Sequence, residues 1–556
     1  MSRWRVCIIL VSSHILYIDE KVEAVKEVAS VTCVALLIYG VYVLINAHQT
    51  TKKPHIIFIL ADDLGWADVS FHGSSQIPTP NIDALAADGV VLNNYYTHPI
   101  CTASRAALMT GLYATRLGLQ HIPIQPGQPF GLDLKYTLLP QHLKSLGYET
   151  HLIGKWHIGC YDPEHTPTRR GFDTFFGLYY GHADYYTHML HSSEGAVISG
   201  LDFWNYTEPA WEANGLYSTD LYADKAVQLI GNIDKSKPQF IFLSHQAVHS
   251  GNDDNRLQAP AKNVEKFPYI GEKNRTIYAG MLDSLDIAVG RTIRALSEAG
   301  MLEDSVVVFS SDNGGASEGH LSSRGINWPL RGQKSSPWEG GSKVAAFVWS
   351  PLLQKRRRVS NRLMHITDWL PTLYGMAGGV VQQLGNIDGH DMWESLSEDA
   401  LSPRSDFVYN IDPLWGYSAI RKDNFKIVVG PLPEQRTAIP GGERPQHDLN
   451  ELAEQSYSVH RFSRRLLGLS PELLTASPVT NMAAPSTSAN LPPAQMTHAY
   501  QVTFETPRVP EVFRGEPYED VEDWLDQFER TAVVNRWSVQ EKLGRAYFAM
   551  ENSART

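Results

Sequence analysis

The chain has few cysteines for its size: Cys7, Cys33, Cys101 and Cys160 among 556 residues. Secreted folds that depend on disulfides use many more, so this sequence holds no disulfide framework. The chain also lacks an excess of positive charge, since its formal net charge is -12. A basic surface is what attracts nucleic acid, and we therefore expect no nucleic-acid partner.

Long apolar runs are equally scarce. Residues 28–45 contain no charged side chain and approach the length of a membrane span. We therefore predict that residues 1–50 form a signal or anchor region, either a signal anchor or a signal peptide that starts internally. Both interpretations send the rest of the chain to the secretory lumen. The triplets that begin at Asn205 and Asn274 are glycosylation sequons and fit that route.

The stretch Cys101-Thr-Ala-Ser-Arg105 combines a potential nucleophile with a fixed cation. Residues 104–109 favour a helix, and Gly111 is a suitable end for it. Cys101 would then lie at the helix N-terminus, where backbone N–H groups favour an anion. The guanidinium of Arg105 suits a tetrahedral oxyanion. These residues predict an anion site with a nucleophile at its floor, and a buried structural cysteine is the alternative.

Four apolar runs end abruptly in polar or charged residues, as buried parallel strands do when they deliver ligands from their carboxyl ends. The runs and their following residues are 55–61 with Asp62-Asp63, 150–154 with Lys155 and His157, 240–244 with His245 and His249, and 305–311 with Asp312-Asn313. Taken singly, each acidic pair is also typical of a turn, and each histidine of a structural role. Four such ends together favour a shared site.

Helical patterns lie between these runs, at residues 139–146 and 282–296. Alternation of strand and helix predicts an α/β fold with a doubly wound sheet, in which ligands gather at the carboxyl edge. The four strand ends should therefore lie close together. Because adjacent carboxylates repel one another, a bound cation is the economical explanation for Asp62 and Asp63.

These motifs also carry a resemblance. Cys101-Thr-Ala-Ser-Arg105, continued by Leu-Met-Thr-Gly111, resembles the signature of the formylglycine-dependent sulfatases, with alanine where animal members usually carry proline. The resemblance extends over about residues 52–452 and is closest to the arylsulfatase B-like branch. Its supporting strings are Pro54-His-Ile-Ile-Phe-Ile-Leu-Ala-Asp-Asp-Leu-Gly-Trp66, Gly154-Lys-Trp-His-Ile-Gly159, Asn327-Trp-Pro-Leu-Arg-Gly-Gln-Lys334 and Trp338-Glu-Gly-Gly341.

The resemblance implies an alkaline-phosphatase-like mixed sheet with helices on both faces and a smaller C-terminal antiparallel sheet. It implies that a formylglycine-generating enzyme oxidises Cys101 to formylglycine (3-oxoalanine), whose hydrate is the nucleophile, and that one Ca²⁺ is bound. It implies catalytic roles for Cys101, Arg105, Lys155, His157, His249 and Lys334, and metal ligation by Asp62, Asp63, Asp312, Asn313 and residue 101. Within this set, Lys155, Lys334 and His249 are expected to contact the substrate.

The implied activity is hydrolysis of sulfate esters: aryl sulfates, or the N-acetylgalactosamine 4-sulfate of dermatan and chondroitin sulfate. The implied location is lysosomal, secreted, or membrane-anchored with a luminal catalytic domain. One alternative is a phosphate or phosphonate monoester hydrolase of the same superfamily. The other is a sulfatase-like luminal protein without catalysis.

Composition and resemblance divide the chain into segments. We expect a catalytic domain at 51–375, a C-terminal subdomain at 376–455 with a hairpin near 415–429, and a Ser/Pro/Ala/Thr-rich linker at 456–500. Residues 501–556 resemble the start of a retrotransposon gag capsid-like helical domain. The basic run at 354–358 is expected to be a solvated loop.

Overall fold

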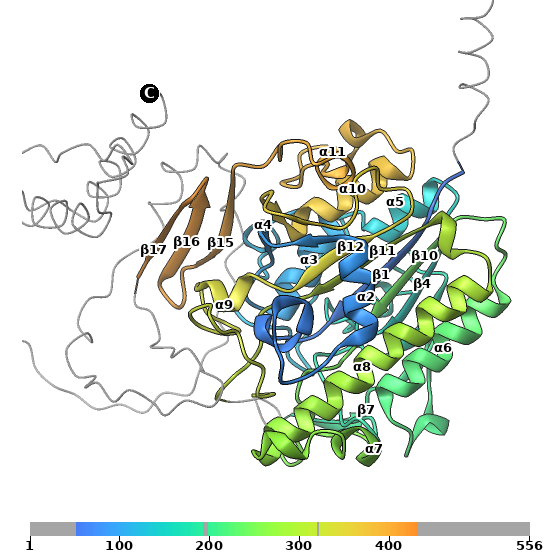
Figure 1. Cartoon of the computed structure of the whole chain (residues 1–556), viewed down its shortest axis with the longest axis vertical. Coiled ribbons are helices and arrows are strands. Elements are labelled where there is room, and N and C mark those ends of the chain that lie inside the picture. The colour runs from blue at the N-terminus through green and yellow to red at the C-terminus, as the bar shows by residue number, and fades with distance from the viewer. Residues whose placement is uncertain (1–51, 193–197, 320–321, 431–556) are drawn as a thin grey trace, which may run out of the picture. The chain divides into compact units, whose positions relative to one another are not determined.

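A ten-stranded mixed sheet is the centre of this computed structural model, which describes residues 52–192, 198–319 and 322–430 (Figure 1). In spatial order its strands are β13 (Arg358–Ser360), β2 (Val90–Leu92), β12 (Ala346–Trp349), β11 (Ser305–Ser311), β1 (His55–Ala61), β10 (Gln239–Ser244), β4 (Glu149–Gly154), β5 (Thr174–Gly177), β8 (Trp204–Asn205) and β9 (Glu208–Pro209).

The five strands β11, β1, β10, β4 and β5 are mutually parallel, whereas β12 and β8 run antiparallel to them on either side. Four of the parallel strands are the runs that the sequence predicts, and they are consecutive neighbours in the sheet. Their carboxyl ends therefore share one edge, as expected for this class of fold. The predicted α/β fold with a mixed sheet is confirmed.

Both faces of the sheet are covered by helices, which β1 shows most clearly because it is buried throughout. Ile56, Phe58 and Leu60 pack into one apolar cluster with residues of α3, α5 and α10. The alternate residues Ile57 and Ile59 pack into a second cluster with α2, α6 and α8. Side chains that alternate between two apolar layers explain why the strand is a continuous apolar run.

The helices are α2 (Pro80–Asp88), α3 (Cys101–Thr110), α4 (Ala114–Leu117), α5 (Leu139–Ser145), α6 (Ser218–Asn232), α7 (Ala261–Val264), α8 (Lys273–Glu298), α9 (Glu339–Ser342), α10 (Trp369–Met376) and α11 (Trp393–Glu398). The predicted helices at 139–146 and 282–296 are α5 and the second half of α8. The longest helix, α8, begins where the Glu272 carboxylate accepts hydrogen bonds from the backbone N–H groups of Asn274 and Arg275. A capping carboxylate at a helix N-terminus is stabilising.

A separate antiparallel sheet follows α11 and contains β15 (Asp406–Asp412), β16 (Tyr417–Lys422) and β17 (Phe425–Val429) in that order. The hairpin predicted near 415–429 is β16–β17. Two small two-stranded sheets complete the described strands: β3 (Tyr95–Tyr96) with β14 (Met364–His365), and β6 (Met189–Ser192) with β7 (Ile198–Leu201). The predicted boundaries of the domains stay predictions.

The basic run at 354–358 is only partly a loop, because Arg358 begins β13. The guanidinium groups of Arg356 and Arg357 pair with Asp88, and that of Arg358 pairs with Asp399. The predicted solvated loop is thus confirmed for residues 354–357, most of which are exposed, and ion pairs to neighbouring elements hold the arginines along the edge of the sheet.

The structure describes both predicted glycosylation sequons but not the predicted terminal segments. Asn274 is exposed in the first turn of α8, and Asn205 is half-buried in β8. The apolar run at 28–45, the linker and the gag-like segment lie outside the described residues. Among the residues that the structure describes, no helix is both long and apolar enough to cross a membrane.

One buried histidine joins the start of α3 to the antiparallel sheet. His98 donates from Nδ1 to the carbonyl of Tyr409 in β15 and accepts at Nε2 from the N–H of Ala114, each at 3.1 Å. Burial lowers the pKa of His98 to about 4, against the opposing effect of the Tyr409 carbonyl. The imidazole is therefore neutral near pH 7, which its accepting nitrogen requires.

We predict that Gly154→Ala destabilises the protein. Gly154 ends β4 with φ +109°, and a Cβ there would lie 1.9 Å from the carbonyl oxygen of Ser244. The two strands would have to separate, at a cost of at least about 2 kcal/mol. Gly147→Ala is the matched control, because its φ is also positive at +89° but nothing lies within 4 Å. Denaturant unfolding checks this; equal losses in both variants would contradict the close approach.

We also predict a loss of stability in acid that depends on His98. The folded-state pKa, about 4, lies below the ordinary value of 6.5. The unfolded chain therefore binds more protons between these pH values, and the free energy of unfolding falls as the pH drops from 6.5 to 4. This histidine accounts for about 3 kcal/mol of that fall. Unfolding measured at pH 7.5 and 4.5 should show a smaller difference for His98→Gln, and an unchanged difference would refute the assignment.

Candidate active site

The predicted helix is present as α3, and Cys101 is its first residue, only 1% exposed. The helix ends at Gly111, which adopts the left-handed conformation at φ +68° as a C-cap. The predicted nucleophile therefore lies at the end of the helix where the backbone N–H groups of the first turn are free. Burial raises the pKa of the Cys101 thiol to about 12. An unmodified thiol here is protonated near pH 7 and is a poor nucleophile.

Three fully buried carboxylates lie where the sheet delivers them. Asp62 and Asp63 follow β1, and Asp312 follows β11, the neighbouring strand. The N–H of Asp63 approaches Asp312 Oδ1 at 3.3 Å, which links the two strand ends directly. Asp63 adopts a left-handed backbone conformation with φ +58°, an uncommon state for a residue other than glycine.

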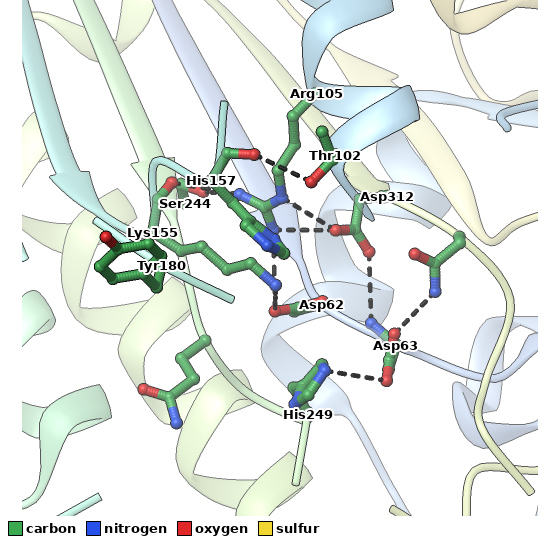
Figure 2. A network of polar contacts seen from close by, with 12 residues as sticks. Asp62, Asp63, Thr102, Arg105, Lys155, His157, Tyr180, Ser244, His249 and Asp312 are labelled. Atoms are coloured by element: carbon green, nitrogen blue, oxygen red, sulfur yellow. Dashed lines mark hydrogen bonds and ion pairs between the residues drawn. The ribbon is translucent and has the colours of Figure 1, made fainter. Parts of the chain in front are cut away.

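Each carboxylate has a cationic partner, and Figure 2 shows those of Asp62 and Asp312. Lys155 Nζ lies 2.5 Å from Asp62 Oδ2, and Lys334 Nζ lies 2.7 Å from Asp63 Oδ1. Arg105 holds Asp312 Oδ2 through Nε and NH2, both at 2.9 Å. Without such partners, buried carboxylates would be strongly destabilising.

NH1 of Arg105 also contacts protein groups, whereas NH2, beyond its ion pair with Asp312, has no hydrogen-bond partner in the described part of the chain. NH1 donates to Ser244 Oγ at 2.6 Å and to the Lys155 carbonyl at 3.1 Å. The sequence predicts Arg105 beside an anion, and the anion that the structure places against it is Asp312. Its catalytic contribution through direct contact with substrate stays a prediction.

The donor set fits a hard divalent cation. Ligand atoms of Asp62, Asp63, Cys101 and His249 all lie within 4.8 Å of one another. Within the described part of the chain, Asp62 Oδ1 and Asn313 Oδ1 are buried and have no hydrogen-bond partner. Asn313 donates from Nδ2 to Asp63 at 2.7 Å, which fixes its amide in the cluster. Buried, unpaired oxygen atoms among carboxylates are what Ca²⁺ or Mg²⁺ would satisfy.

Two histidines lie beside this cluster (Figure 2). His157 donates from Nε2 to the carbonyl of Ile124 at 3.1 Å, and its Nδ1 is buried without a partner in the described chain. His249 donates from Nδ1 to the Ser250 carbonyl at 2.7 Å, and its Nε2 lies 3.6 Å from Asp63 Oδ2. Burial, reinforced by nearby lysines, lowers the pKa of both imidazoles well below 6.5. Both rings are therefore neutral near pH 7.

A cavity of about 310 Å³ opens over Cys101. Its lining includes His157, His249 and Lys334 together with residues 122–126, which are apolar except for Gln125. Its size is at the low end for ligand pockets and suits one small ring with its substituent. The cavity thus brings four of the predicted catalytic residues to one surface.

Sequence reasoning missed several residues of this site. Thr102 donates from Oγ1 to the His157 carbonyl and accepts from the N–H of Ile124, both at 3.1 Å, and so fastens the cavity wall to α3. His182 lines the cavity and stacks on His249 with ring centroids 5.5 Å apart. His245, which also follows β10, is buried and does not line the cavity, so we assign it a structural role; burial lowers its pKa to about 4.

Comparison with known proteins identifies the family. The family model described as "Sulfatase" matches residues 54–380, more than half of the chain. The chain is 45% identical to arylsulfatase J of Mus musculus over 399 residues, 68% of this chain and 65% of that protein. It is 32% identical to arylsulfatase A of Bos taurus over 67% of this chain and 74% of that protein. The chain belongs to the sulfatase family.

Other relatives and a solved structure extend this picture. N-acetylgalactosamine-6-sulfatase of Homo sapiens is 28% identical over 66% of this chain and 70% of that protein. The crystal structure of Ps i-CgsB in complex with a neocarrahexaose superposes with a TM-score of 0.61 and 31% identity, over 68% of this chain and 84% of that one. The fold is thus that of the alkaline-phosphatase-like sulfatases. The chain spans less than two thirds of the length of arylsulfatase J.

Proposed function

We propose that this protein hydrolyses sulfate esters, using a formylglycine formed from Cys101 and one bound Ca²⁺. A single observation carries the proposal: Cys101 begins α3 at the floor of a cavity where Lys334, His157 and His249 converge beside the buried carboxylates. This arrangement matches the requirements of attack on an anionic ester, namely a nucleophile, fixed cations and groups that move protons.

Two groups that the family uses fit the residues present. As a hydrated aldehyde, residue 101 would supply one hydroxyl for attack on sulfur and a second whose deprotonation releases sulfate. A Ca²⁺ held by Asp62, Asp63, Asp312, Asn313 and residue 101 would supply charge stabilisation. The unpaired oxygens of Asp62 and Asn313 support such a cation. The side chain of Cys101 already faces the cavity.

Lysine ammonium groups are the proposed clamp for the sulfate oxygens. Lys155 is fully buried beside Asp62, and Lys334 reaches the cavity beside Asp63. Burial and the carboxylates around it act oppositely on Lys334, and the net result raises its pKa. Lys334 therefore carries a proton at Nζ throughout the neutral range and can orient an ester oxygen.

Proton transfer falls to the two histidines and Lys334. His157 Nδ1 carries a lone pair with no partner in the described chain, so it can take a proton from a hydroxyl at residue 101. On the leaving-group side, Lys334 Nζ already holds a proton, whereas the neutral His249 must first gain one before it can donate. Both remain proposed donors to the departing alcohol.

The proposed substrates are sulfated carbohydrates and aryl sulfates. The names of two relatives, an N-acetylgalactosamine-6-sulfatase and an arylsulfatase, support these two classes. We retain N-acetylgalactosamine 4-sulfate in dermatan or chondroitin sulfate as the proposed physiological ester. We also propose passage through the secretory pathway, glycosylation at Asn205 and Asn274, and modification of Cys101 by a formylglycine-generating enzyme.

We predict that Ca²⁺ stabilises the protein. Because a cation bound only to the folded state shifts the equilibrium, a concentration a hundredfold above Kd adds about 2.7 kcal/mol. The melting temperature should rise with Ca²⁺ and fall when a chelator is added. Asp62→Asn should remove this response, whereas Asp88→Asn, at a carboxylate paired with surface arginines, should keep it. A response that survives in Asp62→Asn would place the cation elsewhere.

We predict that Cys101→Ser accumulates a sulfated enzyme. Serine has one hydroxyl, so it can accept the sulfuryl group but has no second hydroxyl with which to expel it. Turnover of nitrophenyl sulfate should fall at least about a thousandfold, and intact-mass spectrometry should show one added sulfuryl group. Cys160→Ser, at the other cysteine that the structure describes, should turn over normally. Full turnover by Cys101→Ser would refute the mechanism.

Two measurements separate this function from its alternatives. Mass spectrometry of the peptide that contains residue 101 should show formylglycine, and an intact thiol would favour a protein without sulfatase activity. Nitrophenyl sulfate should be hydrolysed faster than nitrophenyl phosphate, and the reverse order would favour a phosphate or phosphonate monoester hydrolase.

A further inference from the structure

An exposed tryptophan lies at the turn between β15 and β16, on the antiparallel sheet. Trp415 is 42% exposed, and its ring centroid lies 5.0 Å from that of His121 at an interplanar angle of 62°. Tyr417 lies behind it, with ring centroids 6.2 Å apart and the planes inclined by 24°. A large indole left partly in water, beside a polar imidazole, is typical of a binding surface rather than of a core.

One buried carboxylate fixes this arrangement. Asp412 Oδ1 accepts the backbone N–H groups of Leu414 and Trp415 at 2.9 and 3.0 Å. Its Oδ2 lies 2.8 Å from Nδ1 of His121. The carboxylate is fully buried, so the turn and the imidazole are held against each other. Because Nδ1 of His121 faces Asp412, the Nε2 atom on the other edge of the ring points away from that carboxylate.

The same segment leads directly into the wall of the catalytic cavity. Ile122 follows His121 and lines the cavity together with Cys101. Asn410 Nδ2 donates to the carbonyl of Gln120 at 3.0 Å, which ties β15 to the start of this segment. The cavity, at about 310 Å³, has room for little more than one ring. A longer substrate must therefore extend beyond the cavity, whose lining includes Ile122, the residue that follows His121.

We propose that Trp415 and His121 form a carbohydrate subsite, which binds the sugar next to the sulfated ring. The C–H face of that pyranose stacks on the indole, and one of its hydroxyls meets His121 Nε2. This inference rests on the proposed function and deepens it, because it selects sulfated oligosaccharides over isolated aryl sulfates.

The test compares two substrates in the full-length protein. Trp415→Ala should raise KM for a chondroitin-type tetrasaccharide with one terminal sulfate, so that kcat/KM falls about tenfold. Nitrophenyl sulfate has no second sugar to occupy the subsite, so its kcat/KM should change less than about twofold. Trp415→Phe should recover part of the loss, because it keeps an aromatic face.

A matched control and a direct binding measurement complete the design. Trp211 is more exposed than Trp415 but lies in another part of the fold, so Trp211→Ala should affect neither substrate. Calorimetric titration of the tetrasaccharide should show about tenfold weaker binding to Trp415→Ala than to the wild type. Equal affinity, equal loss with both substrates, or no binding to the wild type would each overturn the subsite. If nitrophenyl sulfate is not hydrolysed but the binding difference persists, the proposed function fails and the subsite stands.

Discussion

The site depends on three buried carboxylates that share one edge of a parallel sheet. Asp62, Asp63 and Asp312 come from two adjacent strands and are excluded from water. Carboxylates at this spacing and depth require compensating charge. Arg105 from α3, Lys155 from the end of β4 and Lys334 from a distant loop provide it. The helix that carries the nucleophile is therefore positioned by the same ion pairs that hold the carboxylates.

The antiparallel sheet is coupled to both sides of this centre through Glu339 in α9. Its carboxylate accepts hydrogen bonds from the hydroxyls of Tyr409 at 2.6 Å and Tyr96 at 2.8 Å, and pairs with Lys426 at 2.9 Å. Burial raises the pKa of Glu339, but Lys426 and the hydroxyls outweigh it and leave the pKa below the ordinary value. Tyr96 precedes α3 by a few residues, and Lys334 precedes α9 by a similar distance. One carboxylate thus connects β15 and β17 to the segments that carry Cys101 and Lys334.

Sequence alone could predict the parts of the site that local patterns encode. Apolar runs that end in Asp62, Lys155 and Asp312 define strands and their tips, and the parallel arrangement follows from the intervening helices. What the sequence could not supply is pairing across long separations. Lys334 and Asp63 are 271 residues apart, and no periodicity connects them. The contacts of His98 and Glu339 with the antiparallel sheet could not be predicted for the same reason.

The orientation of Arg105 shows a further limit of local patterns. Helical spacing places it one turn after Cys101, and an arginine beside a nucleophile suggests an oxyanion ligand. Only the packing of α3 against β11 and β10 shows that its donors face Asp312 and Ser244. A guanidinium engaged in this way can hold an acidic strand end in place, which spacing within one helix cannot reveal.

Under the proposed function, the charges of the site also couple the binding of the cation to the binding of the substrate. Three carboxylates and three cations formally cancel, and both lysines donate to the acids expected to ligate Ca²⁺. A cation that binds Asp62 and Asp63 would compete with the lysines for these carboxylates. The N–H donors of Lys155 and Lys334 would then lack an acceptor. A sulfate ester at the cavity floor is an anion that can accept them. Cation and substrate should therefore strengthen each other's binding, because the same two ammonium groups serve the carboxylates in one state and the ester in the other.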